Sequence, residues 1–499
     1  MRILSEFLKG INIVKSLPQA LDIQIQKVVA DSRHVEKGDL FVALSGSRNN
    51  GHRFIAEAVK RGAAAIIYEE DNFAFDGNLI PIVQVANSHH VFSELLAKYY
   101  ENQHEKVRLI GVTGTNGKTT IAYLIHYCLN LFTTCGLIGT IEYRWRNRIQ
   151  KAMNTTPGLS VFIPLLSEMA QDGISYCVSE VSSHALHQER TAGLRFGTAL
   201  FTNLTQDHLD YHKHFEGYYA AKRKLFLNDS PPDLRIVNID DPYGRRLVEE
   251  IGEGTISYGI RQDADYRAQN VSTSLKGSEF DVSVRGGRTW HVKSNLSLYH
   301  NVYNVLGALS VVSEMGFPLD RVIKHLSNFP GVPGRMERIE KGQPFSIFVD
   351  YAHTPDAFQN VFSAIRPLVK GRVFSVFGCG GDRDRGKRPQ MGRIAAEFSD
   401  AVVLTSDNPR SEDPSQIIDE IEQGILKTTR TLVHRIEDRR EAIQYALEGA
   451  ASNDIVLILG KGHESEQQIG DQIFPFSDTQ VVMEFLQDSA KVGRSHVAY

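Results

Sequence analysis

The segment GVTGTNGKTT, residues 111–120, combines residue types that can bind phosphate. Its glycines let backbone N–H groups converge on phosphate oxygens, Lys118 supplies positive charge, and Thr119 offers a hydroxyl to Mg²⁺. The spacing departs from the common pattern G-x-x-x-x-G-K-[ST], because Val112 stands where the first glycine is expected. A glycine-rich turn that caps a helix is the alternative interpretation. The apolar run before the loop and the helical pattern after it favour a nucleoside triphosphate site.

Two further polar clusters follow predicted strands. EVSSHALHQER places Glu180 after the strand ISYCVS, and TNLTQDHLDYHKH places His208 after the strand that precedes it. A single Glu or His would be an ordinary surface residue, but two clusters after strands of one sheet favour a metal site at that edge. Lys222, in YYAAKRKLFL, is on the sequence alone best explained as part of a solvated basic helix face.

The stretch SDNPRSEDP, residues 406–414, follows the apolar run AVVLT and contains an isolated arginine, Arg410. A turn with a helix cap would explain the local pattern. In a doubly wound sheet, however, ligands bind beyond the carboxyl ends of the strands. Arg410 is therefore a candidate ligand-binding residue.

Helical and strand patterns alternate along most of the chain and predict an α/β fold with three domains. We predict a small N-terminal α/β domain over 1–105 and a central phosphate-loop ATPase-like domain with a mainly parallel sheet over 106–333. A Rossmann-like, doubly wound domain is predicted over 334–499. The polar ENQHEK and the Pro/Gly-rich 330–334 mark the boundaries, and 264–299 is a more β-like excursion.

Composition excludes several classes of protein. With 42% hydrophobic and 23% charged residues and a net charge of -4, the chain has no overall basic field for nucleic acid. Its four cysteines lack C-x-x-C spacing, which fits free thiols in a reducing cytoplasm. Charged residues interrupt the N-terminal apolar stretch, so neither a signal peptide nor a membrane span is expected.

Taken in order, these pieces resemble the Mur ligase family over nearly the whole chain, and within it the members that add meso-diaminopimelate to UDP-N-acetylmuramoyl-L-alanyl-D-glutamate. The resemblance rests on GTNGKTT, NTTPG, EVSSH, DHLDYH, AAK, HNVYN, GRMER, VDYAHTPD, FGCGGDRD, DNPR and GKGHE. It implies a cytoplasmic, monomeric ligase of peptidoglycan synthesis. Such enzymes use ATP and Mg²⁺ to form an acyl phosphate, which the amine of the incoming amino acid attacks.

The resemblance also implies roles for individual residues. The catalytic candidates are Lys118, Glu180, His208 and Lys222. The candidates for Mg²⁺ are Thr119, Glu180, His208 and Lys222 as a CO₂-derived carbamate. ATP contacts fall on Gly114, Thr115, Asn116, Gly117, Lys118, Thr119, Thr120, Asn301, Arg335 and Asp350. UDP-substrate contacts fall on Ser32, Ser47, Arg48, Asn49, Asn154, Thr155, Thr156, Ser182, Gln188 and Arg190. Diaminopimelate contacts fall on Arg383, Asp407, Asn408, Pro409, Arg410, Gly460 and Glu464.

Some alternatives stay open. A sister ligase that adds L-lysine or another diamino acid would lack a partner for Arg410, since lysine has no second carboxylate. A nucleotide-binding protein without ligase activity would not need the DHLDYH, AAK and DNPR set. Arg383 lies in the charged run DRDRGKR and could be a solvated charge, while Ser47 and Asn49 could form a simple turn. Leu298 and His300 stand where relatives often have glycine and phenylalanine, which puts the local adenine contacts in doubt.

Overall fold

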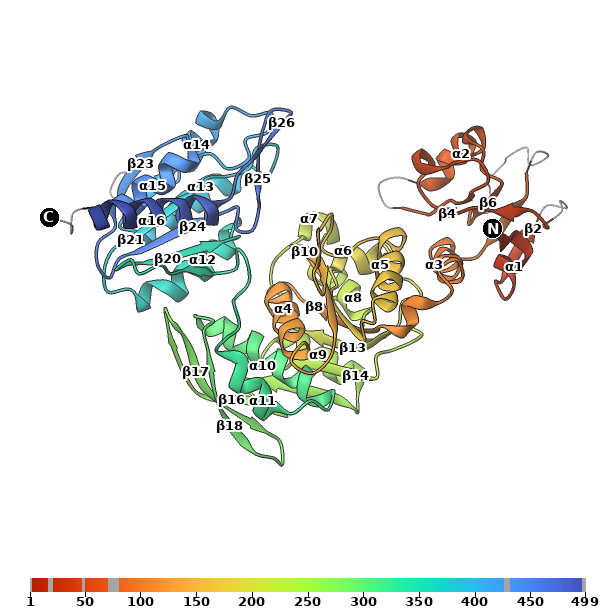
Figure 1. Ribbon diagram of the computed structural model, residues 1–499, viewed down its shortest axis with the longest axis horizontal. Coiled ribbons are helices and arrows are strands. Elements are labelled where there is room, and N and C mark those ends of the chain that lie inside the picture. Colours follow the sequence, from red (N-terminus) through yellow and green to blue (C-terminus); the bar gives the residue numbers. More distant parts are fainter. Residues whose placement is uncertain (1, 17–20, 47–49, 71–79, 426–430, 496–499) are drawn as a thin grey trace. The chain divides into compact units, whose positions relative to one another are not determined.

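The computed structural model describes residues 2–16, 21–46, 50–70, 80–425 and 431–495. The chain divides into two compact units. The first contains Met1–Arg267 with Leu306–Leu319, and the second contains Ala268–Val305 with Asp320–Tyr499. Each unit is α/β, with helices packed on twisted sheets (Figure 1). No helix in the described part of the chain combines the length and the apolar character needed to cross a membrane.

The first unit begins with a small sheet in the strand order β2-β7-β6-β5-β4. Strands β4 to β7 pair in parallel and β2 is antiparallel at one edge. Its strands are β2 (Ile13–Ser16), β4 (Val28–Val29), β5 (Leu40–Val42), β6 (Ala65–Tyr68) and β7 (Ile82–Val85). Around it lie α1 (Leu4–Leu8), α2 (Ile55–Arg61), α3 (Ser88–Tyr99) and the ribbon of β1 (Arg2–Ile3) with β3 (Gln24–Ile25).

Local signals fix the helix ends in this sheet. Helix α2 ends at Gly62, whose positive φ of 102° suits a residue without Cβ. Helix α3 begins after Asn87, whose side chain accepts a hydrogen bond from the backbone N–H of His90.

A larger, mainly parallel sheet forms the rest of the first unit, in the order β11-β10-β9-β12-β8-β13-β14-β15. Strands β9 to β11 pair antiparallel, whereas β9, β12, β8, β13, β14 and β15 run parallel. The strands are β8 (Arg108–Thr113), β9 (Cys135–Ile138), β10 (Glu142–Trp145), β11 (Arg148–Lys151), β12 (Tyr176–Glu180), β13 (Phe196–Phe201), β14 (Leu234–Asn238) and β15 (Thr255–Gly259). The helices are α4 (Lys118–Leu129), α5 (Leu159–Gln171), α6 (Ser183–His187), α7 (Leu209–His212), α8 (Phe215–Arg223) and α9 (Pro242–Ile251).

The strand register places three strand ends in one row. Val112 of β8 lies opposite Glu180 of β12, and Thr113 lies opposite Phe201 of β13. The residues that follow these strands therefore meet at one edge of the sheet, as parallel strands require. The phosphate loop, Glu180 and the segment after Phe201 are side by side.

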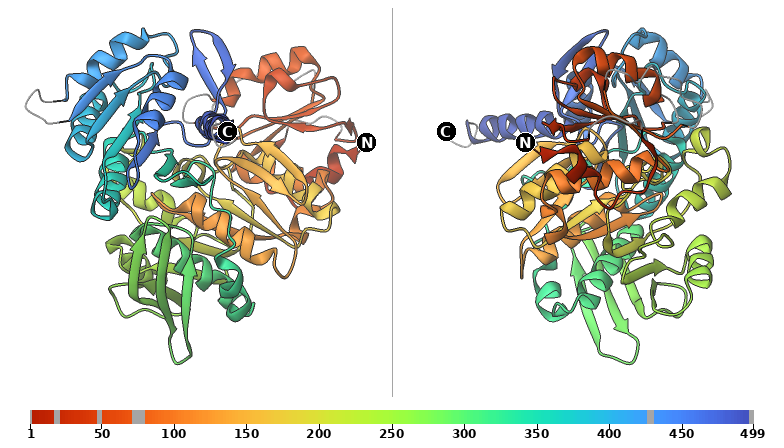
Figure 2. Two further views of the ribbon diagram at one scale, coloured as in Figure 1. Left: turned by 60° about the vertical axis from the view of Figure 1, so that its left-hand side comes forward. Right: turned by 90° about the vertical axis from the view of Figure 1, so that its right-hand side faces the viewer.

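The β-rich excursion predicted over 264–299 is confirmed as three strands. They are β16 (Tyr266–Ser274), β17 (Gly277–Val284) and β18 (Thr289–Ser294), and β17 and β18 form a long antiparallel hairpin, drawn in green in Figure 2. The first two residues of β16 pair with β15. Helices α10 (Tyr299–Glu314) and α11 (Leu319–Leu326) follow.

The C-terminal sheet has the order β19-β20-β24-β21-β22-β23, with β19 antiparallel at one edge and the other strands parallel. Its strands are β19 (Glu337–Ile339), β20 (Ser346–Asp350), β21 (Val373–Phe377), β22 (Ala401–Leu404), β23 (Leu432–Arg435) and β24 (Ile455–Leu459). Its helices are α12 (Pro355–Ile365), α13 (Lys387–Phe398), α14 (Pro414–Glu422), α15 (Arg439–Gly449) and α16 (Asp478–Ser495).

Alternate side chains of this sheet point to opposite faces and form two separate cores. Phe348, Phe377 and Leu404 share one core with residues of α12, α13 and α14. Val349 and Val403 share the other with residues of α15 and α16. Helices thus cover both faces (Figure 1), and the predicted doubly wound architecture is confirmed.

Candidate functional site

The phosphate loop connects β8 to α4 and depends on two glycines. Gly114 has φ +149°, and a Cβ on it would lie 1.8 Å from Oγ1 of Thr202. Gly117 has φ +86° and directly precedes α4. Val112, the departure from the usual motif, is a fully buried residue of β8 paired with Glu180. The turn therefore begins at Gly114, and Val112 belongs to the sheet.

Neighbouring residues after β13 hold the loop in place. Asn116 N–H donates to Oδ1 of Asn203 at 2.9 Å, and the Thr115 N–H donates to the Asn203 carbonyl at 2.8 Å. Oγ1 of Thr202 donates to the Asn116 carbonyl at 2.6 Å. Thr120 is buried within α4. These contacts hold the loop backbone in place.

Two lysines meet at the loop. Nζ of Lys118 donates to the carbonyls of Gly114 and Thr115 at 2.9 and 2.7 Å. Nζ of Lys222, from α8, donates to the same Gly114 carbonyl at 2.6 Å. Lys222 is only 1% exposed and its ammonium lies 4.6 Å from the centre of the Tyr218 ring. The solvated-face interpretation of Lys222 is therefore wrong.

The environment of Lys222 favours its neutral form. Burial lowers its pKa well below the ordinary value of a lysine, and the positive charge of Lys118 lowers it further, while Asp207 acts in the opposite direction. The sequence could not reveal this, because the contact joins residues 108 positions apart.

Glu180 is fully buried at the end of β12 and accepts three hydrogen bonds. Oγ1 of Thr119 donates to it at 2.8 Å, and Thr140 donates through its backbone N–H at 2.7 Å and its hydroxyl at 3.1 Å. A Cβ on Gly139 would lie 2.5 Å from Oε1 of Glu180. The structure thus joins Thr119 and Glu180, two of the predicted Mg²⁺ candidates.

His208 lies after β13 with a left-handed backbone at φ 53°. Its side chain is 44% exposed, with Nδ1 3.4 Å from Asp207 and the ring centre 6.1 Å from that of Tyr218. Among the described residues, no group of three or more His, Cys, Asp or Glu side chains is arranged to hold a metal ion. A metal site here would therefore need ligands of other types as well. The predicted set includes two of them, the Thr119 hydroxyl and a carbamate on Lys222.

Four of the predicted UDP-substrate residues form a hydrogen-bonded group beside Glu180, and two more make separate contacts. The hydroxyl of Thr156 donates to the Glu180 carbonyl at 2.8 Å and accepts from the Ser182 N–H at 3.0 Å. Arg190 donates to Oε1 of Gln188 at 2.7 Å and to the Thr156 carbonyl at 3.2 Å. The remaining two contacts are Thr155 with the Thr140 hydroxyl at 3.1 Å and the Asn154 carbonyl with the Tyr143 hydroxyl at 2.8 Å.

Of the remaining UDP-substrate predictions, Ser32 begins a short 3-10 helix between β4 and β5. Ser32 is buried and its hydroxyl donates to Oε2 of Glu57 at 2.9 Å. Ser47, Arg48 and Asn49 lie outside the described residues. No contact joins Ser32 to the Thr156 group among the hydrogen bonds of the described residues.

In the second unit, Asp350 ends β20 and is held by backbone donors. Its carboxylate accepts from the N–H groups of Met336 at 2.6 Å and Ala352 at 2.8 Å. Burial raises the pKa of Asp350, and the nearby Arg335 guanidinium opposes that shift. Arg335 itself lies over the Tyr351 ring, 4.6 Å from its centre. The structure therefore brings Arg335 and Asp350 together.

Asn301 lies at the start of α10, where Nδ2 donates to the Ser297 carbonyl at 2.7 Å and Oδ1 accepts from Asn304 at 2.8 Å. Leu298 has φ 73°, a left-handed conformation that glycine adopts readily, and its side chain is buried in a core that includes Met336. His300 is exposed. At position 298 this chain therefore has a packed leucine where relatives often have a conformationally flexible glycine.

The DNPR segment follows β22, at the carboxyl edge of the C-terminal sheet. Asn408 is buried and donates to Oε2 of Glu464 at 2.9 Å. Nζ of Lys461, which is fully buried, lies 3.1 Å from Oδ1 of Asn408 and 3.0 Å from Oε2 of Glu464. A Cβ on Gly460 would lie 2.9 Å from Oδ2 of Asp407. The structure thus gathers four predicted diaminopimelate residues.

Arg410 is fixed by a neighbouring hairpin. This hairpin, β25 (Glu466–Ile469) with β26 (Gln472–Pro475), extends in blue from the C-terminal sheet in Figure 2. The Arg410 N–H donates to the Gln468 carbonyl at 3.2 Å, and the Arg410 carbonyl accepts from Gly470 at 2.7 Å. Nη1 of Arg410 donates to the Gly381 carbonyl at 2.7 Å.

The second arginine of the predicted pocket is close by. A Cβ on Gly380 would lie 3.0 Å from Nη1 of Arg410 and 3.7 Å from Cγ of Arg383. Arg383 is exposed and donates to the Asp382 carbonyl at 3.0 Å. Pro409 is buried, and its carbonyl would lie 1.8 Å from a Cβ on Gly381.

Several contacting residues were not predicted. Lys461 lies within GKGHE, so the quoted motif already contained the signal. Thr140 and Asn203 carry no recognisable motif of their own, and only the strand register places them at the site. Gln467 and Gln468 form hydrogen bonds with Asp407 and Asn408. They lie in a hairpin whose strands are too short to show a clear alternation of apolar and polar residues.

Comparison with known families agrees with this arrangement. Residues 24–100 match the model of the Mur ligase family, catalytic domain, residues 112–312 match the Mur ligase middle domain, and residues 334–462 match the Mur ligase, glutamate ligase domain. Together these matches cover most of the chain.

Curated relatives match over nearly the full length. The UDP-N-acetylmuramoyl-L-alanyl-D-glutamate–2,6-diaminopimelate ligase of Alkaliphilus metalliredigens is 42% identical over 470 residues, 93% of this chain and 94% of the relative. The ligase of the same name from Solibacter usitatus is 42% identical over 489 residues, 97% of this chain and 98% of the relative.

Solved structures have the same fold. A UDP-N-acetylmuramoyl-L-alanyl-D-glutamate–2,6-diaminopimelate ligase is 33% identical with a TM-score of 0.71, and the match covers 98% of this chain and 99% of that one. The MurF ligase of Thermotoga maritima in complex with ADP, 21% identical with a TM-score of 0.58 over 93% of this chain and 98% of that one, shares the fold. The predicted three-domain α/β architecture is confirmed, and the chain belongs to the Mur ligase family.

Proposed function

We propose that this protein is an ATP-dependent ligase that adds meso-diaminopimelate to UDP-N-acetylmuramoyl-L-alanyl-D-glutamate in the synthesis of peptidoglycan precursors. The observation that carries the proposal is that this one chain contains two sites of different chemistry. One sheet edge gathers a phosphate loop, two lysines and Glu180, and another gathers DNPR with Glu464. The relatives are named for a reaction that needs both sites.

The chemistry explains why ATP is consumed. A carboxylate is a poor electrophile, because the leaving group would be an oxide ion. Transfer of the γ-phosphoryl group from ATP to the D-glutamate carboxylate gives an acyl phosphate and ADP. The amine of diaminopimelate attacks the acyl carbon, and the C–O bond to phosphate breaks, so that an amide and inorganic phosphate form. Positioning and charge neutralisation provide most of the catalysis in phosphoryl transfer.

The first site suits the phosphoryl-transfer half of this reaction. Lys118 follows the glycine turn and would lie beside the transferred phosphoryl group, where its charge stabilises developing negative charge. Thr119 and Glu180 present a hydroxyl and a carboxylate 2.8 Å apart, the hard oxygen donors that Mg²⁺ prefers. Bound Mg²⁺ would supply charge neutralisation at the phosphates. We assign His208 to the same metal environment.

Lys222 would contribute as a carbamate. Only an unprotonated amine attacks CO₂, forming an N–C bond and releasing a proton. The burial of Lys222 beside the cation of Lys118 favours that unprotonated form. The product is an anion, which would meet both Lys118 and the metal favourably. Carbamylation thus replaces a neutral buried amine with an anion that balances the charge of Lys118.

The group around Thr156 would bind the UDP-linked peptide. Arg190 is half-buried and its guanidinium is already oriented by Gln188 and the Thr156 carbonyl. A guanidinium is well suited to an anionic substrate group. Ser32 and the segment 47–49 are proposed contacts for the uridine nucleotide.

The second site would bind and select the amino acid. Arg410 offers paired donors to a carboxylate, each charged hydrogen bond contributing about 1.5–3 kcal/mol. Glu464 offers an acceptor for an ammonium group. meso-Diaminopimelate carries a carboxylate and an ammonium at both ends, whereas lysine lacks the distal carboxylate. The proposed adenine and ribose contacts are Asn301, Arg335 and Asp350.

Further expectations accompany this proposal. We place domain boundaries at 105/106 and 333/334, and we expect a monomeric enzyme in the cytoplasm. The test is phosphate release by the purified protein with ATP, Mg²⁺, the UDP-dipeptide and meso-diaminopimelate. We expect release only when both the acceptor and the amino acid are present. Release from ATP alone would instead favour a nucleotide-binding protein without ligase activity.

A further inference from the structure

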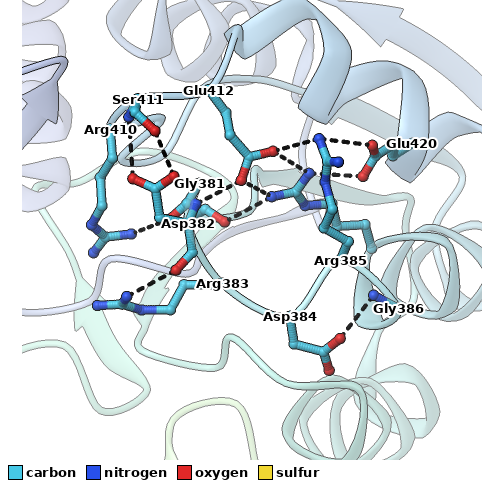
Figure 3. A network of polar contacts seen from close by, with 12 residues as sticks. Gly381, Asp382, Arg383, Asp384, Arg385, Gly386, Arg410, Ser411, Glu412 and Glu420 are labelled. Atoms are coloured by element: carbon cyan, nitrogen blue, oxygen red, sulfur yellow. Dashed lines mark hydrogen bonds and ion pairs between the residues drawn. The ribbon is translucent and has the colours of Figure 1, made fainter.

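We propose that Glu412 and Arg388 form an ionic clamp that positions Arg410 and Arg383 and so sets the selectivity of the amino-acid pocket. The inference rests on the proposed function, because it assigns the pocket to a substrate with a distal carboxylate. Both residues lie outside the predicted set of substrate contacts. They act on the arginines through the backbone of residues 380–382 (Figure 3).

Glu412 lies two residues after Arg410 and bonds to three groups. Its carboxylate accepts two hydrogen bonds from the Arg388 guanidinium, both at 2.9 Å, in a bidentate pair. It also accepts from Arg385 at 2.9 Å and from the backbone N–H of Asp382 at 2.6 Å. The last contact ties the segment that carries Arg410 to the residue that precedes Arg383.

Arg388 anchors this arrangement inside the protein. It is fully buried on α13, where Nη1 also donates to Oε2 of Glu420 at 2.7 Å and Nη2 to the Gly380 carbonyl at 3.2 Å. Hydrogen bonds from Arg388 lower the pKa of Glu412 to about 2, so the carboxylate is ionised at any physiological pH. The two carboxylates offset the buried charge of Arg388.

A second pair of contacts joins the same two segments. Asp382 accepts hydrogen bonds from Ser411, at 2.6 Å from the hydroxyl and 3.3 Å from the backbone N–H. Asp382 and Arg410 both have left-handed backbones, with φ of 55° and 51°. Residues other than glycine adopt this conformation only where surrounding contacts hold it. Glu412 and Ser411 supply such contacts to Asp382, and the β25–β26 hairpin supplies them to the backbone of Arg410.

The consequence concerns the two pocket arginines. Nη1 of Arg410 and Cγ of Arg383 both approach the Gly380 position, and Figure 3 shows both side chains extending to the same side of this loop, so two like charges share one region. Without the clamp, repulsion would favour their separation. When the clamp is present, the two arginines are already ordered before a carboxylate ligand binds. The ligand then loses no binding free energy in ordering them.

The test compares wild-type protein with Glu412→Gln in steady-state phosphate release, with meso-diaminopimelate varied and ATP and the UDP-dipeptide saturating. The variant keeps the size of the side chain but loses the charge that pairs with Arg388. We expect KM for meso-diaminopimelate to rise about tenfold, the equivalent of one charged hydrogen bond, with a smaller change in kcat. KM for ATP should stay at its wild-type value, and the preference over lysine should fall.

Two further variants complete the design. Arg388→Lys keeps the positive charge but not the bidentate geometry, and should raise KM for meso-diaminopimelate even if Glu412→Gln does not fold. Glu484→Gln breaks an exposed ion pair with Arg440 in the same domain and should match wild type. If wild type turns over meso-diaminopimelate and folded clamp variants keep its KM, the clamp proposal is wrong. If wild type does not use meso-diaminopimelate at all, the proposed function itself fails, and the clamp's substrate assignment fails with it.

Discussion

Nζ of Lys222 lies 2.6 Å from the backbone carbonyl of Gly114, so that a buried amine on α8 contacts the first turn of the phosphate loop. Lys118 donates to the same carbonyl. Two amines thus share one acceptor at this loop, and burial together with the charge of Lys118 favours the neutral form of Lys222. Carbamylation of Lys222 would place a negative charge beside Lys118.

We therefore expect Lys222→Ala to abolish ligase activity, and wild-type activity to rise with added bicarbonate. The direct measurement is ¹³C NMR of protein supplied with ¹³C-bicarbonate, which should show a carbamate carbon that is absent from the variant. Lys224→Ala, which removes an exposed lysine of the same segment, is the matched control and should retain activity. Full activity of Lys222→Ala, with or without bicarbonate, would rule out the assignment.

Glu180 gives a separate prediction about Mg²⁺. Glu180→Gln keeps the shape of the side chain but removes its negative charge, so the Mg²⁺ concentration needed for half-maximal activity should rise by about tenfold or more. A Mg²⁺ titration of phosphate release measures this. Glu142→Gln is the control, because Glu142 lies on β10 of the same sheet and pairs with Arg144 and with Tyr123 of α4. An unchanged Mg²⁺ requirement in Glu180→Gln would exclude this residue from the metal site.

Leu298 combines an unfavourable backbone with a buried side chain. Leu298→Ala should cost about 2–5 kcal/mol of unfolding free energy, because it leaves a cavity while the left-handed φ of 73° remains. Leu298→Gly makes a similar cavity but relieves about 1–2 kcal/mol of backbone strain. The glycine variant should therefore be the more stable of the two in urea unfolding. The usual order, with alanine more stable, would show that the backbone at Leu298 is not strained.

The clamp predicts a pH dependence of stability. The pKa of Glu412 is lowered from 4.5 to about 2 in the folded protein, chiefly by Arg388. Its contribution to stability is therefore complete above pH 4.5 and is lost as the pH falls toward 2. Urea unfolding should show wild type more stable than Glu412→Gln at pH 7 and at pH 5, with the difference shrinking below pH 4.5. A difference that stays constant down to pH 3 would contradict the ion pair.

Much of this fold follows from local patterns. Strand and helix periodicity predicted β8, α4 and the C-terminal strands, because parallel strands in such sheets are continuous apolar runs. The order of motifs led to the family, and DNPR pointed to Arg410 before its contacts were known.

Other features depend on contacts between distant residues. YYAAKRKLFL has the composition of a solvated helix, and only packing against Gly114 buries Lys222. A leucine gives no indication of a left-handed backbone, so the positive φ of Leu298 could not be predicted from its residue type. Arg388 and Glu412 appear in the sequence as members of ordinary charged runs, and their pairing joins residues 24 positions apart.

The central claim is that Arg410 selects meso-diaminopimelate through its distal carboxylate. The most direct measurement is kcat/KM for meso-diaminopimelate and for L-lysine in wild type and in Arg410→Met. We predict that wild type prefers meso-diaminopimelate by about tenfold to a hundredfold or more, and that Arg410→Met loses most of that preference. Comparable values for the two amino acids in wild type, or a preference that survives in Arg410→Met, would contradict the account.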